Sequence, residues 1–190
     1  MRGVYPVEEV RAAEAALMAR LPEGALMARA ATGLALECVR LLDRVYGRRV
    51  VLLVGAGNNG GDALYAGAAL ARRGARVQAM LLAPDRAHRE GLAAFTAAGG
   101  RVVPVDAESL AGADLVVDGI VGIGGSGGLR GAAVPLAGAA REVLTVAVDV
   151  PSGVSADTGE AGADSISADV TVTFGALKPG LLVGEGARRT

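Results

Sequence analysis

Short aliphatic segments alternate along the chain with segments of helical periodicity, and this alternation limits what the chain can fold into. Residues 50–54 are five consecutive aliphatic residues, as expected of a strand buried on both faces. Further strands are predicted at 76–82, 101–105, 114–118, 144–150 and 170–174. Helical periodicity covers residues 7–18, 25–45, 61–73, 87–98 and 132–141. Helices that alternate with strands in this order predict a mostly parallel sheet with helices on both faces.

The length of 190 residues fits one domain, residues 1–190, and is too short for two ordinary ones. Aromatic residues make up only 3% of the chain, so the core must consist of aliphatic side chains. The expected fold is a three-layer, Rossmann-like α/β domain preceded by N-terminal helices.

Charge and cysteine content exclude several classes of function. The 19 basic and 20 acidic residues give a net charge of −1, which offers no electrostatic basis for nucleic-acid or membrane binding. The single cysteine, Cys38, excludes an internal disulfide and fits a reducing compartment. The first 30 residues lack the apolar core of a signal peptide, so the sequence predicts a cytoplasmic protein.

The notable polar side chains share one position, because each lies where a predicted strand ends. They are Asn58, Asn59 and Asp62 after the first strand, Asp118 at the end of the fourth, Asp149 at the end of the fifth and Lys178 after the sixth. Ligands of open parallel sheets bind outside the carboxyl ends of the strands, so one crevice is expected to collect these groups. For Lys178 a solvated turn is an equally good interpretation.

The loop at residues 55–60 matches G-x-G-x-x-G between a strand and a helix, which by itself is a weak signal for an anion near a helix N-terminus. Asp62 lies in the first helical turn and would repel a pyrophosphate. The loop is therefore expected to hold polar chemistry as well. The glycine-rich segment 119–128 behind Asp118 has backbone N–H groups that can surround an anion.

Four motifs together resemble one family. Residues 54–62, Val-Gly-Ala-Gly-Asn-Asn-Gly-Gly-Asp, resemble the hallmark loop of the NAD(P)H-hydrate epimerases, or YjeF N-terminal domain family. Segments 117–122, 148–153 with 157–159, and 168–174 with 178–180 match in the same order, so the resemblance covers nearly the whole chain. It implies a Rossmann-like isomerase that interconverts the R and S forms of hydrated NADH and NADPH at C6.

The resemblance also implies a set of site residues. Those expected to contact the hydrated cofactor are Asn58, Asn59, Gly60, Gly61, Asp62, Gly122, Ile123, Gly124, Gly125, Ser126, Gly127, Gly128 and Asp149. A potassium ion is expected at Asn59, Asp118 and Ser152, which all offer the oxygen atoms that a hard cation prefers.

The reaction itself suggests a role for one residue. The configuration at C6 is lost if its hydroxyl leaves or if the ring opens, and either route moves a proton at oxygen. Asp149 follows an apolar strand and precedes Pro151, in a setting that fixes its side chain. We therefore hypothesise that Asp149 is the catalytic acid/base.

Partners are also expected from the resemblance. Relatives usually continue through another strand, and many into a fused dehydratase, so residues 1–190 are expected either to lack the last strand or to be a fragment of a bifunctional protein. A homodimer through the N-terminal helices is a further expectation. Substrate preference between hydrated NADH and NADPH stays open.

Two other functions compete with the epimerase. One is an NAD-dependent oxidoreductase, supported only by the glycine fingerprint. It needs an acid about 20 residues further on, and Asp85, behind Pro84, fits poorly. The other is a non-catalytic nucleotide-binding module of the same fold.

Overall fold

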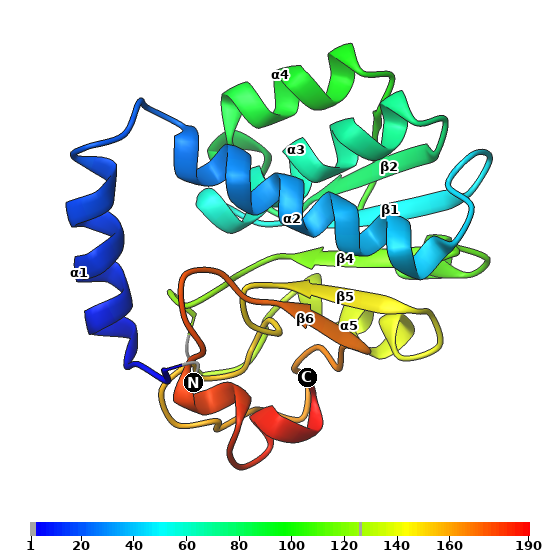
Figure 1. The fold of residues 1–190 in the computed structure, drawn as a ribbon. Coiled ribbons are helices and arrows are strands. Elements are labelled where there is room, and N and C mark those ends of the chain that lie inside the picture. The colour runs from blue at the N-terminus through cyan, green and yellow to red at the C-terminus, as the bar shows by residue number, and fades with distance from the viewer. Residues whose placement is uncertain (1–2, 126) are drawn as a thin grey trace.

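A six-stranded sheet forms the centre of the molecule in the computed structural model, which describes residues 3–125 and 127–190 (Figure 1). Its strands are β1 (Arg49–Val54), β2 (Arg76–Leu81), β3 (Arg101–Val103), β4 (Leu115–Gly119), β5 (Thr145–Val148) and β6 (Val170–Val172). Their order is β3-β2-β1-β4-β5-β6, and every pairing is parallel. This is the strand order of a Rossmann-type doubly wound fold, as the sequence predicted.

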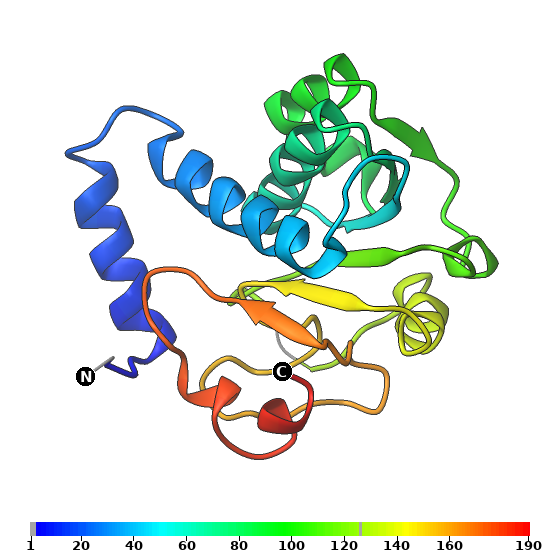
Figure 2. The same ribbon diagram turned by 45° about the vertical axis from the view of Figure 1, so that its right-hand side comes forward.

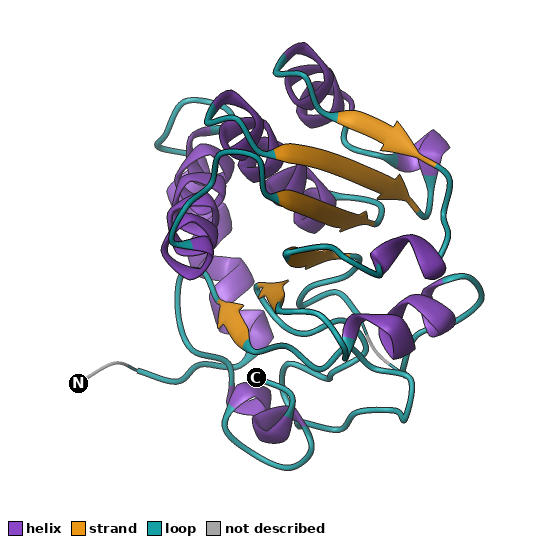
Figure 3. Cartoon of the chain, turned by 90° about the vertical axis from the view of Figure 1, so that its right-hand side faces the viewer, coloured by secondary structure: helices purple, strands orange, loops and turns teal. Residues whose placement is uncertain are grey.

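Alternate residues of the central strand serve two separate cores. In β1, Val50, Leu52 and Val54 pack against α2 (Ala25–Leu42), α3 (Asn58–Arg72) and α4 (Arg89–Ala97). Val51 and Leu53 face the opposite side and pack against α5 (Ala133–Ala140). Figure 3 shows helices on both sides of the strands. Burial of both faces explains the uninterrupted aliphatic run, because a strand with one wet face would alternate with polar residues.

The N-terminal helix α1 (Val7–Met18) stands apart from these layers, beyond the carboxyl ends of the strands (Figure 2). Val7 is buried with residues of the loops that follow β5 and β6. The backbone N–H of Val7 donates to Asp157 at 2.8 Å, and Arg11 Nη2 donates to the Ile123 carbonyl at 3.4 Å. This helix therefore closes the side of the molecule at which the strands end.

The helix after β1 begins three residues earlier than the sequence predicts. It starts at Asn58 rather than near residue 61, and it follows Gly57, whose φ is +88°. Two glycines in its first turn disfavour a helix on propensity alone, which accounts for the difference. The consequence is that both asparagines of the loop lie in the first helical turn, beside its free N–H groups.

Other predicted elements agree with the structure to within a few residues. The second helix ends at Leu42 rather than at residue 45, because Asp43 turns the chain with a φ of +55°. Several strands are also shorter than predicted. Among the described residues, none of the helices combines the length and apolar character needed to cross a bilayer.

Candidate active site

The polar residues that the sequence assigned to one crevice gather at the carboxyl ends of β1, β4 and β5. The chain runs from β1 toward β2 on one side, whereas β4 to β6 extend on the other, so the sheet changes direction between β1 and β4. Ligands of doubly wound sheets bind at this switch point. The loops after the two strands approach so closely that a Cβ atom on Gly55 would overlap the Ile120 carbonyl. Glycine at position 55 therefore lets the two sides of the crevice meet.

Asp118 at the end of β4 is held by donors on both of its carboxylate oxygens. Oδ1 accepts from Ser152 Oγ at 2.6 Å and from the Ile120 N–H at 3.2 Å, and Oδ2 accepts from the Ser152 N–H at 2.8 Å. The side chain is fully buried. Burial raises the pKa of Asp118 to about 6, against the opposing effect of these hydrogen bonds. Among the described residues, no cationic side chain forms an ion pair with it.

Ser152 joins the loops that follow β4 and β5. Its hydroxyl lies 2.6 Å from Asp118 Oδ1 and 3.0 Å from both the N–H and the carbonyl of Val121. Three oxygen atoms, from a carboxylate, a hydroxyl and a carbonyl, thus come together in a buried place. The structure brings Asp118 and Ser152 into direct contact, and the potassium ion expected at these residues stays a prediction.

Asn59 occupies the same region from the first turn of α3. It is half-buried, and its Nδ2 has no hydrogen-bond acceptor among the described residues. Its Oδ1 is 2.7 Å from the place where a Cβ on Gly122 would lie. Asn58, in contrast, is exposed.

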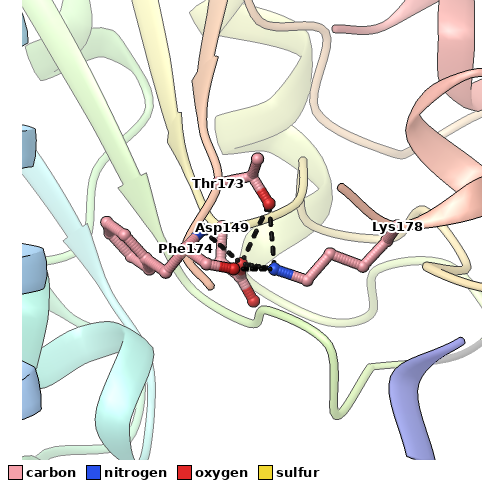
Figure 4. Close-up of polar contacts among 4 residues, drawn as sticks. All are labelled: Asp149, Thr173, Phe174 and Lys178. Carbon is pink, nitrogen blue, oxygen red and sulfur yellow. Dashed lines mark hydrogen bonds and ion pairs between the residues drawn. The ribbon is translucent and has the colours of Figure 1, made fainter. Parts of the chain in front are cut away.

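Asp149 lies directly after β5 in an unusual backbone conformation, with a φ of +68°. Few non-glycine residues adopt this region, and the strain costs about 1–3 kcal/mol. The carboxylate forms an ion pair with Lys178, whose Nζ lies 2.5 Å from Asp149 Oδ1 (Figure 4). Thr173 Oγ1 and the Phe174 N–H also point at Oδ1, each at 3.3 Å. The turn thus aims one carboxylate oxygen at a fixed cation.

The second oxygen of Asp149 has a different environment. In the described chain no donor bonds Oδ2, which lies 3.3 Å from the Cβ position of Gly122. A side chain at position 122 would fill this space and would clash with the Asn59 amide. Asp149, Asn59 and Gly122, three residues that the sequence assigned to substrate contact, therefore border one small space.

Lys178 is fully buried, which excludes the solvated turn that the sequence left open. Its Nζ donates to Asp149 Oδ1, to Thr173 Oγ1 at 2.9 Å and to the Phe174 carbonyl at 2.7 Å (Figure 4). All three hydrogens of the ammonium group are thus used. Because a buried ammonium without a counter-charge is costly, the Asp149 carboxylate is the counter-charge that this geometry supplies to Lys178.

Two further carboxyl groups interact electrostatically with Asp149. Asp62, in the first turn of α3, is 7% exposed, and burial together with the charges of Asp149 and Glu14 raises its pKa to about 7. Glu14 on α1 is half-buried, and desolvation and Asp149 raise its pKa, against the effect of Lys178 and Arg11. Sequence reasoning missed Glu14, since an acidic residue on an amphipathic helix gives no signal of its own.

The glycine-rich segment after β4 lies beside α1. Gly122 and Gly125 form a turn with a 2.9 Å backbone hydrogen bond, and Gly127 and Gly128 both have a φ of +79°. Ile123 accepts the hydrogen bond from Arg11, and Gly124 is exposed. Of the predicted contacts, Ser126 lies outside the described residues.

The opposite edge of the sheet has a hollow of a different character. Arg49, Arg76, Gln78 and Arg101 line it, and the described lining contains no acidic side chain. The Arg49 guanidinium is already bonded to the carbonyl oxygens of Ser109 and Ala111. The buried aspartates Asp62, Asp118 and Asp149 lie instead at the carboxyl edge, where the strand ends predicted them.

The chain matches the family described as YjeF-related protein N-terminus over residues 23–180. It is 54% identical over 186 residues to the bifunctional NAD(P)H-hydrate repair enzyme Nnr of Mycobacterium tuberculosis H37Rv, which covers 94% of this chain and 38% of that protein. It is 47% identical over 190 residues to the NAD(P)H-hydrate epimerase of Microbacterium testaceum, which covers 96% and 73%. The chain thus spans less than half of the bifunctional relatives' length.

Among solved structures, the crystal structure of yeast ynu0 matches with a TM-score of 0.79 and 21% sequence identity. The match covers 94% of this chain and 82% of the yeast chain. Its fold is the one described above, with helices α2 to α5 on the two faces of the sheet.

Proposed function

This chain belongs to the family of YjeF-related protein N-termini, and on that premise we propose that it is an NAD(P)H-hydrate epimerase, an isomerase that interconverts the R and S forms of hydrated NADH and NADPH at C6. The observation that carries the proposal is the state of Asp149. One of its oxygens is fixed by the buried Lys178, while the other faces the space beside Gly122. A carboxylate held in this way is an acid/base positioned at a binding surface.

The reaction needs little more than such a group. C6 carries a hydroxyl and adjoins the ring nitrogen, so its configuration changes through ring opening and closure or through loss and addition of water. Both routes require proton transfer at an oxygen atom and neither requires an oxidant. Names of the relatives support the substrate, since they include an NAD(P)H-hydrate epimerase and bifunctional NAD(P)H-hydrate repair enzymes.

Binding of the dinucleotide is proposed at the glycine-rich segments. The first turn of α3 directs free N–H groups toward the crevice, which suits a phosphate. Gly124, Gly127 and Gly128 leave the backbone of the second segment open to a large anionic ligand. The hydrated ring then lies near Asn59, Gly122 and Asp149.

We also propose a potassium site at Asn59, Asp118 and Ser152. A fully buried carboxylate without a cationic partner in the described chain fits a bound cation, as does the convergence of oxygen atoms around Ser152. The side-chain amide of Asn59, whose Nδ2 has no acceptor in the described chain, fits too. A rotation of the amide group by about 180° places Oδ1 where Nδ2 now lies. When bound, the ion would supply positive charge that favours ionised Asp118 and ties together the loops after β1, β4 and β5.

The partners follow from the reaction. An epimerase only interconverts the R and S hydrates. A dehydratase is needed to convert the S hydrate back to NADH or NADPH. We propose that this dehydratase acts with the present domain in the cytoplasm, fused to it as in the bifunctional relatives or as a separate protein. A homodimer through the N-terminal helices is part of the same proposal.

The test uses a mixture of R and S hydrates and an excess of a dehydratase that consumes only the S form. An epimerase leads to complete consumption of the mixture, faster than the uncatalysed rate, whereas consumption stops near the S fraction without one. A stop at that fraction contradicts the proposal. Hydride exchange with free NAD would instead support the oxidoreductase, and binding without either activity would support the non-catalytic module.

A further inference from the structure

We propose that Asp62 is a second catalytic carboxyl group, the general acid that works opposite Asp149 in the proposed epimerisation. This inference rests on the proposed function and adds a residue role to it. The two side chains differ in their surroundings: Asp149 has a buried cation and two further donors on Oδ1, whereas no such partner bonds Asp62 in the described part of the chain.

The environment of Asp62 favours the neutral form. Only 7% of the residue is exposed, and Oδ1 is buried without a hydrogen-bond partner among the described residues. An ionised carboxylate in such a place loses its hydration and receives no donor in return. A protonated carboxyl group avoids most of that cost and keeps a hydrogen that it can donate.

The charged groups that face Asp62 act in the same direction. Asp149 at the end of β5 and Glu14 on α1 both raise its pKa, in addition to burial. The nearby cation, Lys178, has its three hydrogens committed to Asp149, Thr173 and Phe174. Arg11 on α1 interacts with Glu14 and donates to the Ile123 carbonyl. The surroundings of Asp62 thus favour a protonated acid, whereas Asp149 is paired with a cation, and such a difference in environment assigns acid and base roles in paired sites.

Each route to the other epimer uses one acid and one base. In ring opening, Asp149 Oδ2 takes the C6 hydroxyl proton, C6 becomes an aldehyde, and the C6–N bond breaks with its electron pair left on nitrogen, which takes the proton of Asp62. Closure on the other face reverses these transfers, so both residues return to their starting states. In water loss, Asp62 protonates the departing hydroxyl and the nitrogen lone pair forms a C=N bond. Water then adds to the other face and gives its proton to Asp149, and solvent exchange resets the pair.

The test is the pH dependence of turnover in Asp62→Asn, measured with the hydrate mixture and excess dehydratase. The variant keeps the size of the side chain and removes the acid, so kcat is expected to fall by about 10²–10⁴-fold while KM changes little. In the unsubstituted protein the rate should decline as pH rises through about 7, since the acid must hold its proton. This alkaline decline should be absent from the residual activity of the variant.

Two controls make the outcome specific. Glu142→Gln removes an exposed carboxyl group between α5 and β5, at the opposite edge of the sheet, and should leave both kcat and the pH profile unchanged. Asp62→Glu retains an acid and should shift the alkaline decline without abolishing it, which also tests the role if Asp62→Asn fails to fold.

The possible results distinguish the role of Asp62 from the proposed epimerase function. An unsubstituted protein without epimerase activity overturns the proposed function. An active protein whose Asp62→Asn variant keeps a normal kcat and the alkaline decline overturns only the role of Asp62. A raised KM with normal kcat would likewise overturn it, because Asp62 would then contribute to binding alone.

Discussion

Asp118 and Asp149 have the same sequence signature and opposite environments. Each ends an aliphatic run, Asp118 within β4 and Asp149 directly after the neighbouring strand β5, and both are buried. Asp118 has both oxygens occupied by short-range donors from Ser152 and Ile120. Asp149 has one oxygen on a buried ammonium group, and the other lies beside Gly122 with no donor among the described residues.

The difference shows that a position at a strand end places a carboxylate at this edge of the sheet but does not determine its functional role. A carboxylate with both oxygens engaged holds loops together and is poorly placed to exchange protons. A carboxylate that is fixed through one oxygen only can react through the other. Asp118 is thus suited to organise the site and Asp149 to carry the proposed chemistry.

The largest expected effect is that of Asp149→Asn. Loss of the base should lower epimerase kcat by about 10²–10⁴-fold and leave hydrate binding largely intact. Coupled turnover assays measure the first quantity, and titration calorimetry with the hydrate measures the second. Near-normal turnover would remove Asp149 from the catalytic role. The double variant Asp149→Asn/Lys178→Met, which leaves no unpaired buried ammonium group, controls for a loss of activity through unfolding.

Lys178→Met should have the next largest effect and tests what fixes Asp149. Removing one partner of a buried ion pair leaves the other charge uncompensated, which typically lowers the free energy of unfolding by about 3–5 kcal/mol. Partial exposure of Asp149 places the expectation at the lower end of that range. Urea unfolding measures the change, and the double variant should recover much of it. Equal stability of Lys178→Met and the unsubstituted protein would show that the pair is not energetically coupled.

Asp118→Asn should have a smaller effect, mainly on stability. An amide at this position cannot accept every bond that Asp118 accepts, so one of the Ser152 or Ile120 donors loses its partner. The expected loss in the free energy of unfolding is about 1–3 kcal/mol, and the response of the protein to potassium should disappear. If kcat at saturating substrate instead fell as far as in Asp149→Asn, with stability unchanged, the contrast between the two carboxylates would be wrong.

The smallest expected effect is the pH dependence of stabilisation by potassium. Burial raises the pKa of Asp118 to about 6 in the folded protein, above its unfolded value near 4. The contribution of this group to the free energy of unfolding is therefore full below about pH 4 and is lost as pH rises through about 6. A bound cation opposes that loss, because it favours the ionised form. Potassium at ten times its dissociation constant should therefore stabilise the protein by about 1.4 kcal/mol above pH 7.

Thermal unfolding in potassium and in a large organic cation, at pH 5 and pH 7.5, measures this difference. Stabilisation should be weak at pH 5, where Asp118 is protonated, and should be missing at both pH values in Asp118→Asn. A potassium effect of the same size at both pH values would place the ion elsewhere.

Sequence reasoning predicted the crevice better than it predicted the roles within it. Strand ends placed Asn59, Asp118 and Asp149 at one edge of the sheet, and the structure brings them there. The start of α3 at Asn58 was missed because the glycines of its first turn hide the helical signal. Burial of Lys178 was undecided, because a lysine next to Pro179 and Gly180 reads equally well as a surface turn.

The sequence by itself determined the layered parallel fold and the edge at which polar groups gather, since both depend on local periodicity and on the order of strands. Tertiary structure decided that Asp118 accepts hydrogen bonds on both oxygens and that Asp149 is paired with Lys178. It also left Asp62 Oδ1 without a donor among the described residues. The physical reason is distance along the chain: Ser152 lies 34 residues from Asp118, and Lys178 lies 29 residues from Asp149. Glu14, on a separate N-terminal helix, reaches Asp62 and Asp149 only because α1 closes the carboxyl edge of the sheet.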